Sequence, residues 1–155
     1  MEKKRRKKKE GGDAMITLDK VSMSYSSSGT SYALDNVSLS IKKGEFVFIV
    51  GDSGSGKSTL IKLLLRELTP TSGRIVVNGS DVAKLKHRQV PKFRRNLGIV
   101  FQDFRLLNDR NVYENVAFAQ RVVQTPAREI RKNVPRALAV VGLAGKYKAK
   151  TRQLS

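Results

Sequence analysis

The segment from Gly51 to Thr59 reads GDSGSGKST and has the residue types and the spacing of a loop that holds phosphate groups. Its glycines permit backbone angles and close approaches that a Cβ would block, so successive N–H groups can converge on phosphate oxygens. Lys57 can reach the terminal phosphates as a point charge, and Ser58 offers a hydroxyl to Mg²⁺. The loop therefore predicts binding of a nucleoside triphosphate together with Mg²⁺.

The predicted phosphate-binding residues span the whole loop. They are Gly51, Asp52, Ser53, Gly54, Ser55, Gly56, Lys57, Ser58 and Thr59. Asp52 is expected to face solvent, because a carboxylate that pointed inward would repel the phosphates. An ordinary Gly/Ser turn is the simplest alternative, but such a turn does not require the Lys57–Ser58 pair at the start of a helix.

Two elements have to position this loop. Glu45–Gly51 reads EFVFIVG, and such a nearly continuous apolar run predicts a strand buried on both faces, as in a parallel α/β sheet. Lys57–Leu68 has the length and the residue choice of a helix, which the segment TPTSG would stop. Because this helix would begin at the loop, the positive end of its dipole would point at the bound anion.

Further strands are predicted on both sides of this unit. Alternation of apolar and polar residues predicts the first two, and short apolar runs predict the others. They are Ile16–Tyr25, Ala33–Ile41, Arg74–Gly79 with its Asn-Gly turn, and Leu97–Gln102. The segment Ser26–Ser31 is predicted to be a flexible turn.

From Asn111 onward, apolar residues recur at helical spacing, which predicts a helical segment. Thr125 is expected to cap a helix that has Pro126 at its first position. Pro135 lies inside the second apolar stripe, so a break near Asn133 is expected, with a new helix beginning there. The residues predicted to lie on the apolar stripes are Val112, Val116, Ala119, Ile130, Val134, Leu138 and Val141.

Length and composition limit the class of protein. With 155 residues, 39% of them hydrophobic, the chain has the size of one globular domain with a real core. Cysteine is absent and histidine occurs once, at His87, so disulfides, thiolate metal sites and multi-histidine metal sites are excluded. No apolar run approaches the length of a membrane-spanning helix.

The formal net charge of +18 is spread along the chain, and residues 1–14 contribute +4 of it, from seven Lys/Arg and three Asp/Glu. Three interpretations of this basic tail stay open. The first is a solvated, disordered arm. The second is a segment attracted to anionic lipid headgroups. The third is an extension upstream of a true start at Met15.

Four segments, in this order, resemble the ATP-binding subunit of ABC transporters. They are VSMSY, ALDNVSLSIKKGEFVFIVGDSGSGKST, FQDFRLL and VYENVAF. The resemblance covers residues 15–155 and implies an α/β P-loop NTPase of the ABC ATPase type. Its nucleotide-binding core would span residues 15–110, with antiparallel strands at the N-terminus, and the start of a helical subdomain would span residues 111–155. Val90-Pro91 and the segments FQDFRLL and VYENVAFA are most similar to the cell-division branch of the family, with the lipoprotein-release and macrolide-export branches as alternatives.

The resemblance implies roles for two further side chains. Tyr25 matches the aromatic residue that stacks on adenine, with Tyr32 as the alternative, or Tyr25 simply ends a strand. Gln102 matches the glutamine that contacts Mg²⁺ and the attacking water.

The resemblance also implies partners and a location. The segment after Gln102, with Phe104, Leu106 and Leu107, matches the surface that receives a helix of a polytopic membrane protein, although plain core packing is equally simple. The full-length protein would form a homodimer around two ATP molecules at the cytoplasmic face of the plasma membrane, as a peripheral subunit.

Hydrolysis in this family needs parts that the sequence does not contain. After Thr59 there is no apolar strand that runs into Asp-Glu, and His87 lies in the wrong setting for the switch histidine and is expected at the surface. Leu154-Ser155 matches the first two residues of the signature loop that caps the ATP of the opposite subunit. We therefore expect a fragment of a longer protein that binds ATP weakly and hydrolyses it negligibly.

There are three alternatives to an ATPase subunit, and sequence features argue against the first two. A small nucleotide kinase shares the phosphate loop, but it would follow the loop with acceptor-binding helices and an arginine-rich lid. A nucleic-acid-binding module would interleave basic residues with exposed aromatics on one face, and no such pattern is present, so no nucleic-acid partner is expected. A truncated but stable partner-binding fragment would co-purify with a membrane protein.

Overall fold

A computed structural model describes residues 14–26 and 31–154. The chain divides into two compact units, residues 1–91 and residues 92–155, and each is described by itself. The predicted turn at Ser26–Ser31 and the predicted tail at residues 1–14 fall largely outside the described residues. Ala14, the last residue assigned to the tail, is the first residue of strand β1.

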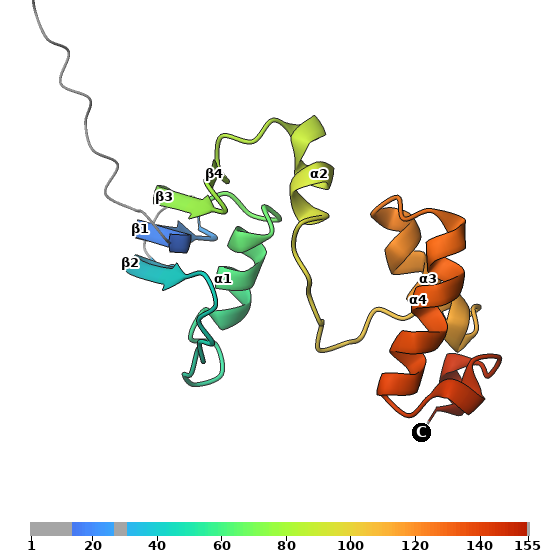
Figure 1. Ribbon diagram of the computed structural model, residues 1–155. Coiled ribbons are helices and arrows are strands. Elements are labelled where there is room, and N and C mark those ends of the chain that lie inside the picture. Colours follow the sequence, from blue (N-terminus) through green and yellow to red (C-terminus); the bar gives the residue numbers. More distant parts are fainter. Residues whose placement is uncertain (1–13, 27–30, 155) are drawn as a thin grey trace, which may run out of the picture. The chain divides into compact units, whose positions relative to one another are not determined.

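The first unit contains a four-stranded antiparallel sheet with the strand order β2-β1-β3-β4 (Figure 1). Its strands are β1 (Ala14–Ser24), β2 (Tyr32–Lys42), β3 (Ser72–Val77) and β4 (Ser80–Asp81). These bounds confirm the strands predicted on either side of the phosphate loop to within two residues at most ends. The turn between β3 and β4 is also confirmed, with Asn78 and Gly79 both at positive φ, 45° and 73°.

Helix α1 (Lys57–Leu64) lies against this sheet (Figure 1). It buries Leu60 and Leu63, and β1 and β3 bury Val21 and Ile75. Removing these apolar side chains from water contributes about 25 cal/mol per Å² of buried area. This packing holds the start of α1, and with it the end of the glycine loop, at one place beside the sheet.

The helix begins where the sequence predicts, but it ends four residues before Leu68. Arg66 adopts a left-handed conformation with φ of 58°. Its N–H donates to the Leu63 carbonyl over 3.0 Å, and the Glu67 N–H donates to the Lys62 carbonyl over 2.8 Å. This pair of bonds is a Schellman motif. The motif usually has glycine at the left-handed position, which is why the sequence pattern did not reveal it.

Two predicted strands, Glu45–Gly51 and Leu97–Gln102, are wrong, because neither segment is a strand in the structure. Phe46 and Val50 are 84% and 87% exposed, and Val100 is 92% exposed. A strand that is apolar on both faces needs a neighbour on each side. Within residues 14–26 and 31–154, no strand pairs with either segment.

Limited proteolysis can check this exposure. Chymotrypsin is expected to cleave after Phe46 and Phe48, which are 84% and 79% exposed, before it cleaves after Phe93, which is 8% exposed. The difference should be at least about tenfold in initial rate, because a buried site is cut only after local opening. Mass spectrometry of early fragments gives the order, and early cleavage after Phe93 with Phe46 and Phe48 intact would contradict it.

Along the chain, β4 is followed by a short 3-10 helix, η1 (His87–Gln89), and by helix α2 (Val90–Arg94). His87 is exposed, which confirms its predicted place at the surface. The second unit is built on helices α3 (Val112–Val122) and α4 (Ala127–Val140). Two 3-10 helices, η2 (Ala144–Lys146) and η3 (Thr151–Gln153), follow them.

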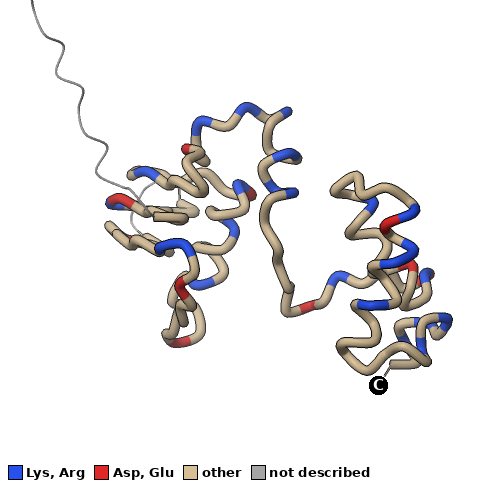
Figure 2. The backbone as a smooth tube through the Cα atoms, in the orientation of Figure 1, with Lys and Arg blue, Asp and Glu red and all other residues tan. Residues whose placement is uncertain are grey.

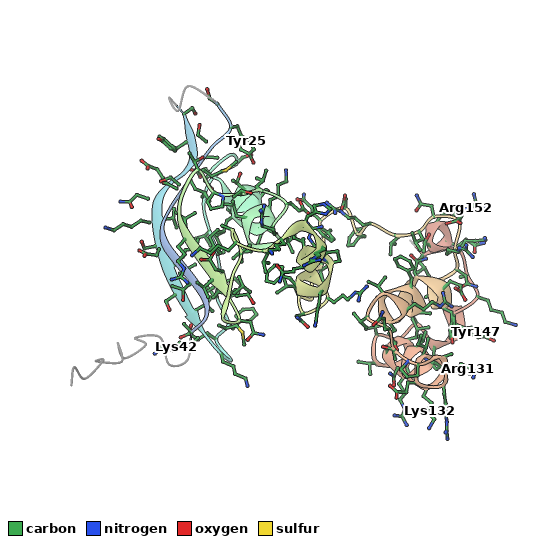
Figure 3. The ribbon with its side chains drawn as sticks, turned by 90° about the horizontal axis from the view of Figure 1, so that it is seen from above. Tyr25, Lys42, Arg131, Lys132, Tyr147 and Arg152 are labelled. Atoms are coloured by element: carbon green, nitrogen blue, oxygen red, sulfur yellow. The ribbon has the colours of Figure 1, made fainter. Side chains whose placement is uncertain are left out.

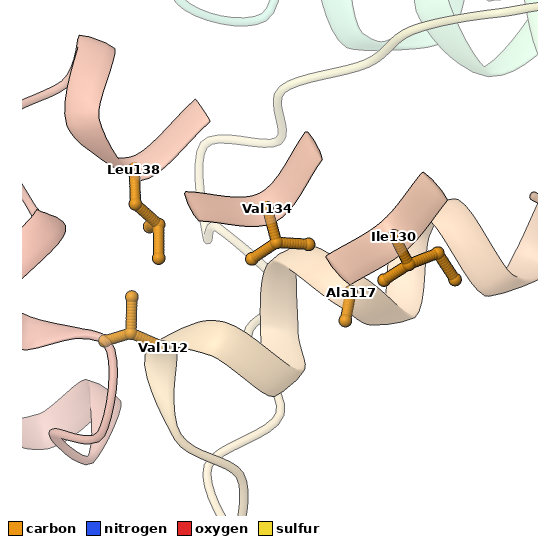
Figure 4. Close-up of a cluster of buried hydrophobic side chains, with 5 residues drawn as sticks. All are labelled: Val112, Ala117, Ile130, Val134 and Leu138. Carbon is orange, nitrogen blue, oxygen red and sulfur yellow. The ribbon is translucent and has the colours of Figure 1, made fainter. Parts of the chain in front are cut away.

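Helices α3 and α4 enclose a small apolar core (Figure 4). Its buried members are Val112, Ala117, Ile130, Val134 and Leu138. The structure thus confirms four of the predicted stripe residues as buried, and Val116 packs against them while partly exposed. The other two stripe residues, Ala119 and Val141, are exposed and do not contribute to this core. The buried alanine of α3 is Ala117 and not Ala119.

Helix α4 differs from the prediction at its start and at Pro135. Its N-cap is Pro126 rather than Thr125, and no side chain caps it. Pro135 lies inside a continuous helix, so the expected break near Asn133 is wrong. Proline removes the hydrogen bond to the carbonyl four residues earlier. Burial of Ile130, Val134 and Leu138 on one face offsets that loss and keeps the helix continuous.

Lysine and arginine residues are spread along both units, and acidic residues are sparse beside them (Figure 2). Arg131 and Lys132 on α4 are exposed and project away from the core of their unit (Figure 3). Among the described residues, no helix is long and apolar enough to cross a membrane.

Candidate nucleotide-binding site

The glycine loop closes onto its own lysine. The Lys57 Nζ donates to the Gly51 carbonyl over 2.7 Å, to the Asp52 carbonyl over 2.6 Å and to the Ser55 Oγ over 3.2 Å. An ammonium group has three N–H donors, so these bonds use all of them. The loop thus places the ammonium inside the ring of loop residues, where a phosphate oxygen could replace a carbonyl as its acceptor.

Gly56 joins this loop to helix α1 and fixes its approach to the sheet. It is the helix N-cap, with φ of 88°. A Cβ at Gly56 would overlap the Ala33 carbonyl oxygen and lie 2.8 Å from the Leu34 Cδ2. Glycine is therefore required here for two reasons, the left-handed backbone and the close approach of strand β2.

The start of helix α1 can accept an anion. The first N–H groups of an α-helix have no partner within the helix. Gly56 provides no side-chain cap, and the first turn contains no acidic residue. The hydroxyl of Ser58 is on an exposed residue of this turn, and Asp52 is exposed as well. Free N–H groups, a helix dipole, a lysine and a hydroxyl are the groups that a Mg²⁺–triphosphate needs.

Tyr25 lies beside this helix (Figure 3). Its hydroxyl is 3.1 Å from the hydroxyl of Thr59, which is buried in the first turn of α1. Tyr25 remains 62% exposed, and the alternative, Tyr32, is 48% exposed. The bond to Thr59 ties the aromatic ring to the phosphate loop, and no bond of this kind is found for Tyr32 among the described residues. This contact favours Tyr25 as the residue that would meet the base of a nucleotide.

Gln102 lies in the second unit, where it is exposed and outside any helix or strand. The loop belongs to the first unit, so the role of Gln102 at Mg²⁺ stays a prediction. The segment after it makes a tight turn. The guanidinium of Arg105 lies 3.7 Å from the centroid of the Phe101 ring, and Phe104 is 71% exposed.

The first turn of α3 follows this segment. Asn111 is its N-cap, and the Asn111 Oδ1 accepts from the Glu114 N–H over 2.8 Å. Arg121 donates a 2.8 Å hydrogen bond to the Glu114 carboxylate, which lowers the pKa of Glu114 below its ordinary value of 4.5. The stability that the Glu114–Arg121 pair contributes is therefore present at neutral pH. It is lost only as the pH falls through the lowered pKa of Glu114.

The described part of the chain contains no metal site built from side-chain ligands alone. No three His, Cys, Asp or Glu residues gather there in a way that could hold a metal ion. The predicted Mg²⁺ ligands, Ser58 and Gln102, are uncharged, because the phosphates themselves would supply the negative charge that balances the ion.

Comparison with known proteins decides what kind of loop this is. The family model described as ABC transporter matches residues 34–155, which include the glycine loop, Gln102 and the whole second unit. The chain belongs to the ABC transporter family. The α/β P-loop fold of the ABC ATPase type, with its antiparallel N-terminal strands, is thereby confirmed.

Two curated relatives show how far the similarity extends. The cell division ATP-binding protein FtsE of Mycobacterium tuberculosis is 51% identical over 141 residues, which cover 91% of this chain and 61% of the relative. The methionine import ATP-binding protein MetN of Geobacillus kaustophilus is 46% identical over 142 residues, which cover 91% of this chain and 42% of the relative. The chain thus spans less than two thirds of the length of either relative.

A solved structure is also similar to this chain. The ATP-binding cassette MJ0796, in a dimeric post-hydrolysis state bound to ADP and Pi, superimposes with a TM-score of 0.79 at 34% sequence identity. The match covers 91% of this chain and 63% of that chain. This ABC family member was solved as a dimer with the products of ATP hydrolysis bound.

Proposed function

We propose that this chain is the nucleotide-binding part of an ABC-type ATPase subunit, and that residues 51–59 hold the phosphates of ATP together with Mg²⁺. The observation that carries this proposal is the geometry at Gly56 and Lys57. The left-handed glycine leaves the start of α1 uncapped, and the ammonium of Lys57 lies within the loop next to that helix end.

Each remaining site residue has a role in this proposal. The hydroxyl of Ser58 would bind Mg²⁺, and the Gln102 side chain would contact Mg²⁺ and the attacking water. The exposed ring of Tyr25 would stack on adenine, an interaction worth about 1–3 kcal/mol per base in general. Its bond to Thr59 supports this role, because it holds the ring near the loop that would hold the phosphates.

The reaction of the complete subunit would be hydrolysis of ATP to ADP and phosphate. Within the 155 residues, no apolar strand runs into an Asp-Glu pair after the loop. Hydrolysis by this chain alone is therefore expected to be negligible. It should appear in a chimera in which the C-terminal part of the M. tuberculosis FtsE relative continues this chain.

A role in cell division is the finer part of the proposal. The 51% identity to FtsE supports it. The subunit would then be a homodimer, peripheral at the cytoplasmic face of the plasma membrane. It would contact an FtsX-like polytopic membrane protein through the segment after Gln102, where Phe104 and Leu106 are exposed.

Methionine import is a second candidate, because a MetN protein is 46% identical over the same 91% of the chain. Lipoprotein release and macrolide export remain the alternatives that the sequence motifs leave open. Complementation separates the two main candidates. The chimera is expected to restore division in an FtsE-depleted strain and not to restore growth of a methionine-import mutant, and the reverse result would overturn the assignment to cell division.

Calorimetry of the chimera with Mg²⁺–ATP tests the nucleotide site itself. Saturable binding of about one ATP per chain is the expected result. No heat of binding, in a chimera that circular dichroism shows to be folded, would contradict the proposal.

The role of Tyr25 is tested in the same assay. Replacing Tyr25 by alanine should weaken ATP binding by about 10- to 100-fold, because the stacking energy is lost. Tyr25→Phe keeps the ring and should stay within about threefold of the wild type, since only the hydroxyl bond to Thr59 is removed. Tyr32→Ala is the matched control. A larger loss for Tyr32→Ala than for Tyr25→Ala would assign the base contact to Tyr32.

A further inference from the structure

The side chain of Asn115, on the first turns of α3, holds the segment that follows Gln102. Its Oδ1 accepts from the Leu107 N–H over 2.8 Å, and its Nδ2 donates to the Leu107 carbonyl over 3.1 Å. The second N–H of the same amide donates to the Asn111 carbonyl over 3.0 Å. An asparagine amide has two N–H donors and one acceptor oxygen, so all of its hydrogen-bonding groups are engaged.

The segment that Asn115 holds is conformationally unfavourable. Phe104 and Arg105 have φ of 53° and 45°, and the left-handed region is disfavoured for residues with a side chain. Within the turn, the Phe104 N–H donates to the Phe101 carbonyl over 3.1 Å, and Arg105 lies over the Phe101 ring. Support from outside the turn comes at Leu107, five residues after Gln102, where Asn115 bonds both backbone groups.

The same turn of α3 also holds the chain that leads to Leu154. The Val112 N–H donates to the Ala149 carbonyl and the Tyr113 N–H to the Tyr147 carbonyl, each over 3.0 Å. These N–H groups belong to the first turn of the helix and have no partner within it. Leu107 and residues 147–149, which are distant from each other in the sequence, are therefore bonded to one helix end.

We propose that Asn115 is a positioning residue, which joins the Gln102 segment to α3 so that this segment and the chain leading to Leu154 move as one body. The inference rests on the proposed function in one respect, that Gln102 acts at ATP. A change of position at Gln102 would then reach residues 147–154 through two bonds at Leu107 and the first turn of α3. Nothing in this role requires Asn115 to touch the nucleotide.

Hydrogen exchange of the 155-residue chain tests the bond itself, without nucleotide. In Asn115→Ala, the Leu107 N–H loses its acceptor and should exchange about tenfold faster or more. Amides in the later turns of α3 should change by less than about twofold, because alanine favours the helix. Asn133→Ala, an exposed asparagine on α4 of the same unit, is the matched control and should leave Leu107 unchanged. Unchanged exchange at Leu107 in Asn115→Ala would overturn the inference.

Asn115→Asp provides a second variant of nearly the same size. Its carboxylate can still accept from the Leu107 N–H, but it cannot donate to the carbonyls of Leu107 and Asn111. Exchange at Leu107 should then rise less than in Asn115→Ala. Exchange at Leu107 as slow as in the wild type in both variants would show that the side chain does not hold this segment.

Kinetics of the chimera, reconstituted with its membrane partner, test the positioning role. Both Asn115 variants should lower kcat for ATP hydrolysis by about tenfold while KM for ATP stays within about twofold, because the phosphate loop is untouched. A kcat equal to that of Asn133→Ala would overturn the inference. If the wild-type chimera itself hydrolyses no ATP, the proposed function fails, and the exchange experiment still decides whether Asn115 holds Leu107.

Discussion

Replacing Lys57 by alanine is expected to lower the affinity of the chimera for Mg²⁺–ATP by about 100-fold. A hydrogen bond between an ammonium and a phosphate oxygen is charge-assisted and contributes about 1.5–3 kcal/mol, which corresponds to roughly 10- to 150-fold in affinity. The Lys57 ammonium already lies among the loop carbonyls of Gly51 and Asp52. It needs to travel little to reach a phosphate held by the same loop.

The control for this substitution is Lys62→Ala, which removes an exposed lysine from the last turn of the same helix. It should leave affinity within about threefold, because Lys62 is outside the loop. Calorimetry gives both dissociation constants, and thermal unfolding shows whether the variants remain folded. If Lys57→Ala bound ATP as tightly as Lys62→Ala, the loop would not be the phosphate site and the proposed function would be lost.

The second large effect is expected on stability, from Gly56→Ala. Its Cβ would overlap the Ala33 carbonyl oxygen and crowd Leu34, and its backbone would have to keep φ near 88°. The left-handed conformation costs about 1–2 kcal/mol for a residue with a side chain, and overpacking adds about 1–3 kcal/mol. The first unit should therefore unfold with a free energy lower by about 3 kcal/mol.

Gly54→Ala is the matched control, because Gly54 has nearly the same φ, 83°, and no atom lies within 4 Å of its added Cβ. Only the conformational part of the loss, about 1 kcal/mol, is expected there. Denaturant unfolding followed by circular dichroism measures both. Equal losses in the two variants would mean that the close approach of β2 to the loop is absent in solution.

In the chimera, Gly56→Ala should also weaken nucleotide binding more than Gly54→Ala does. Gly56→Ala displaces the start of α1 from β2, so the N–H groups that would meet the phosphates move with it. Gly54→Ala keeps that helix in place. Comparison of the two variants thus shows whether the loop needs glycine at position 56 only for its backbone angles or also because there is no space for a Cβ.

The elements that sequence patterns predicted well are those set by local chemistry. The β3–β4 turn follows from Asn78-Gly79, since both residues tolerate positive φ. The start of α1 follows from the glycine loop before it, and the buried stripe of α4 follows from helical spacing. The same local reasoning was wrong at Pro135, because packing of Ile130, Val134 and Leu138 outweighed the helix-breaking preference of one residue. It was also wrong at Thr125, which does not cap the helix.

The sequence was sufficient for the phosphate loop, for the strands on either side of it and for the resemblance to the ABC transporter family, because each of these depends on short motifs whose residues are close together along the chain. Tertiary structure alone decided that Tyr25 meets Thr59, that Gly56 has no room for a Cβ beside Ala33, and that Asn115 holds Leu107. It also decided that Glu45–Gly51 is not a strand. These four findings have one cause in common. Each depends on which residue is the neighbour in space, and the spacing of residues along the chain does not identify that neighbour.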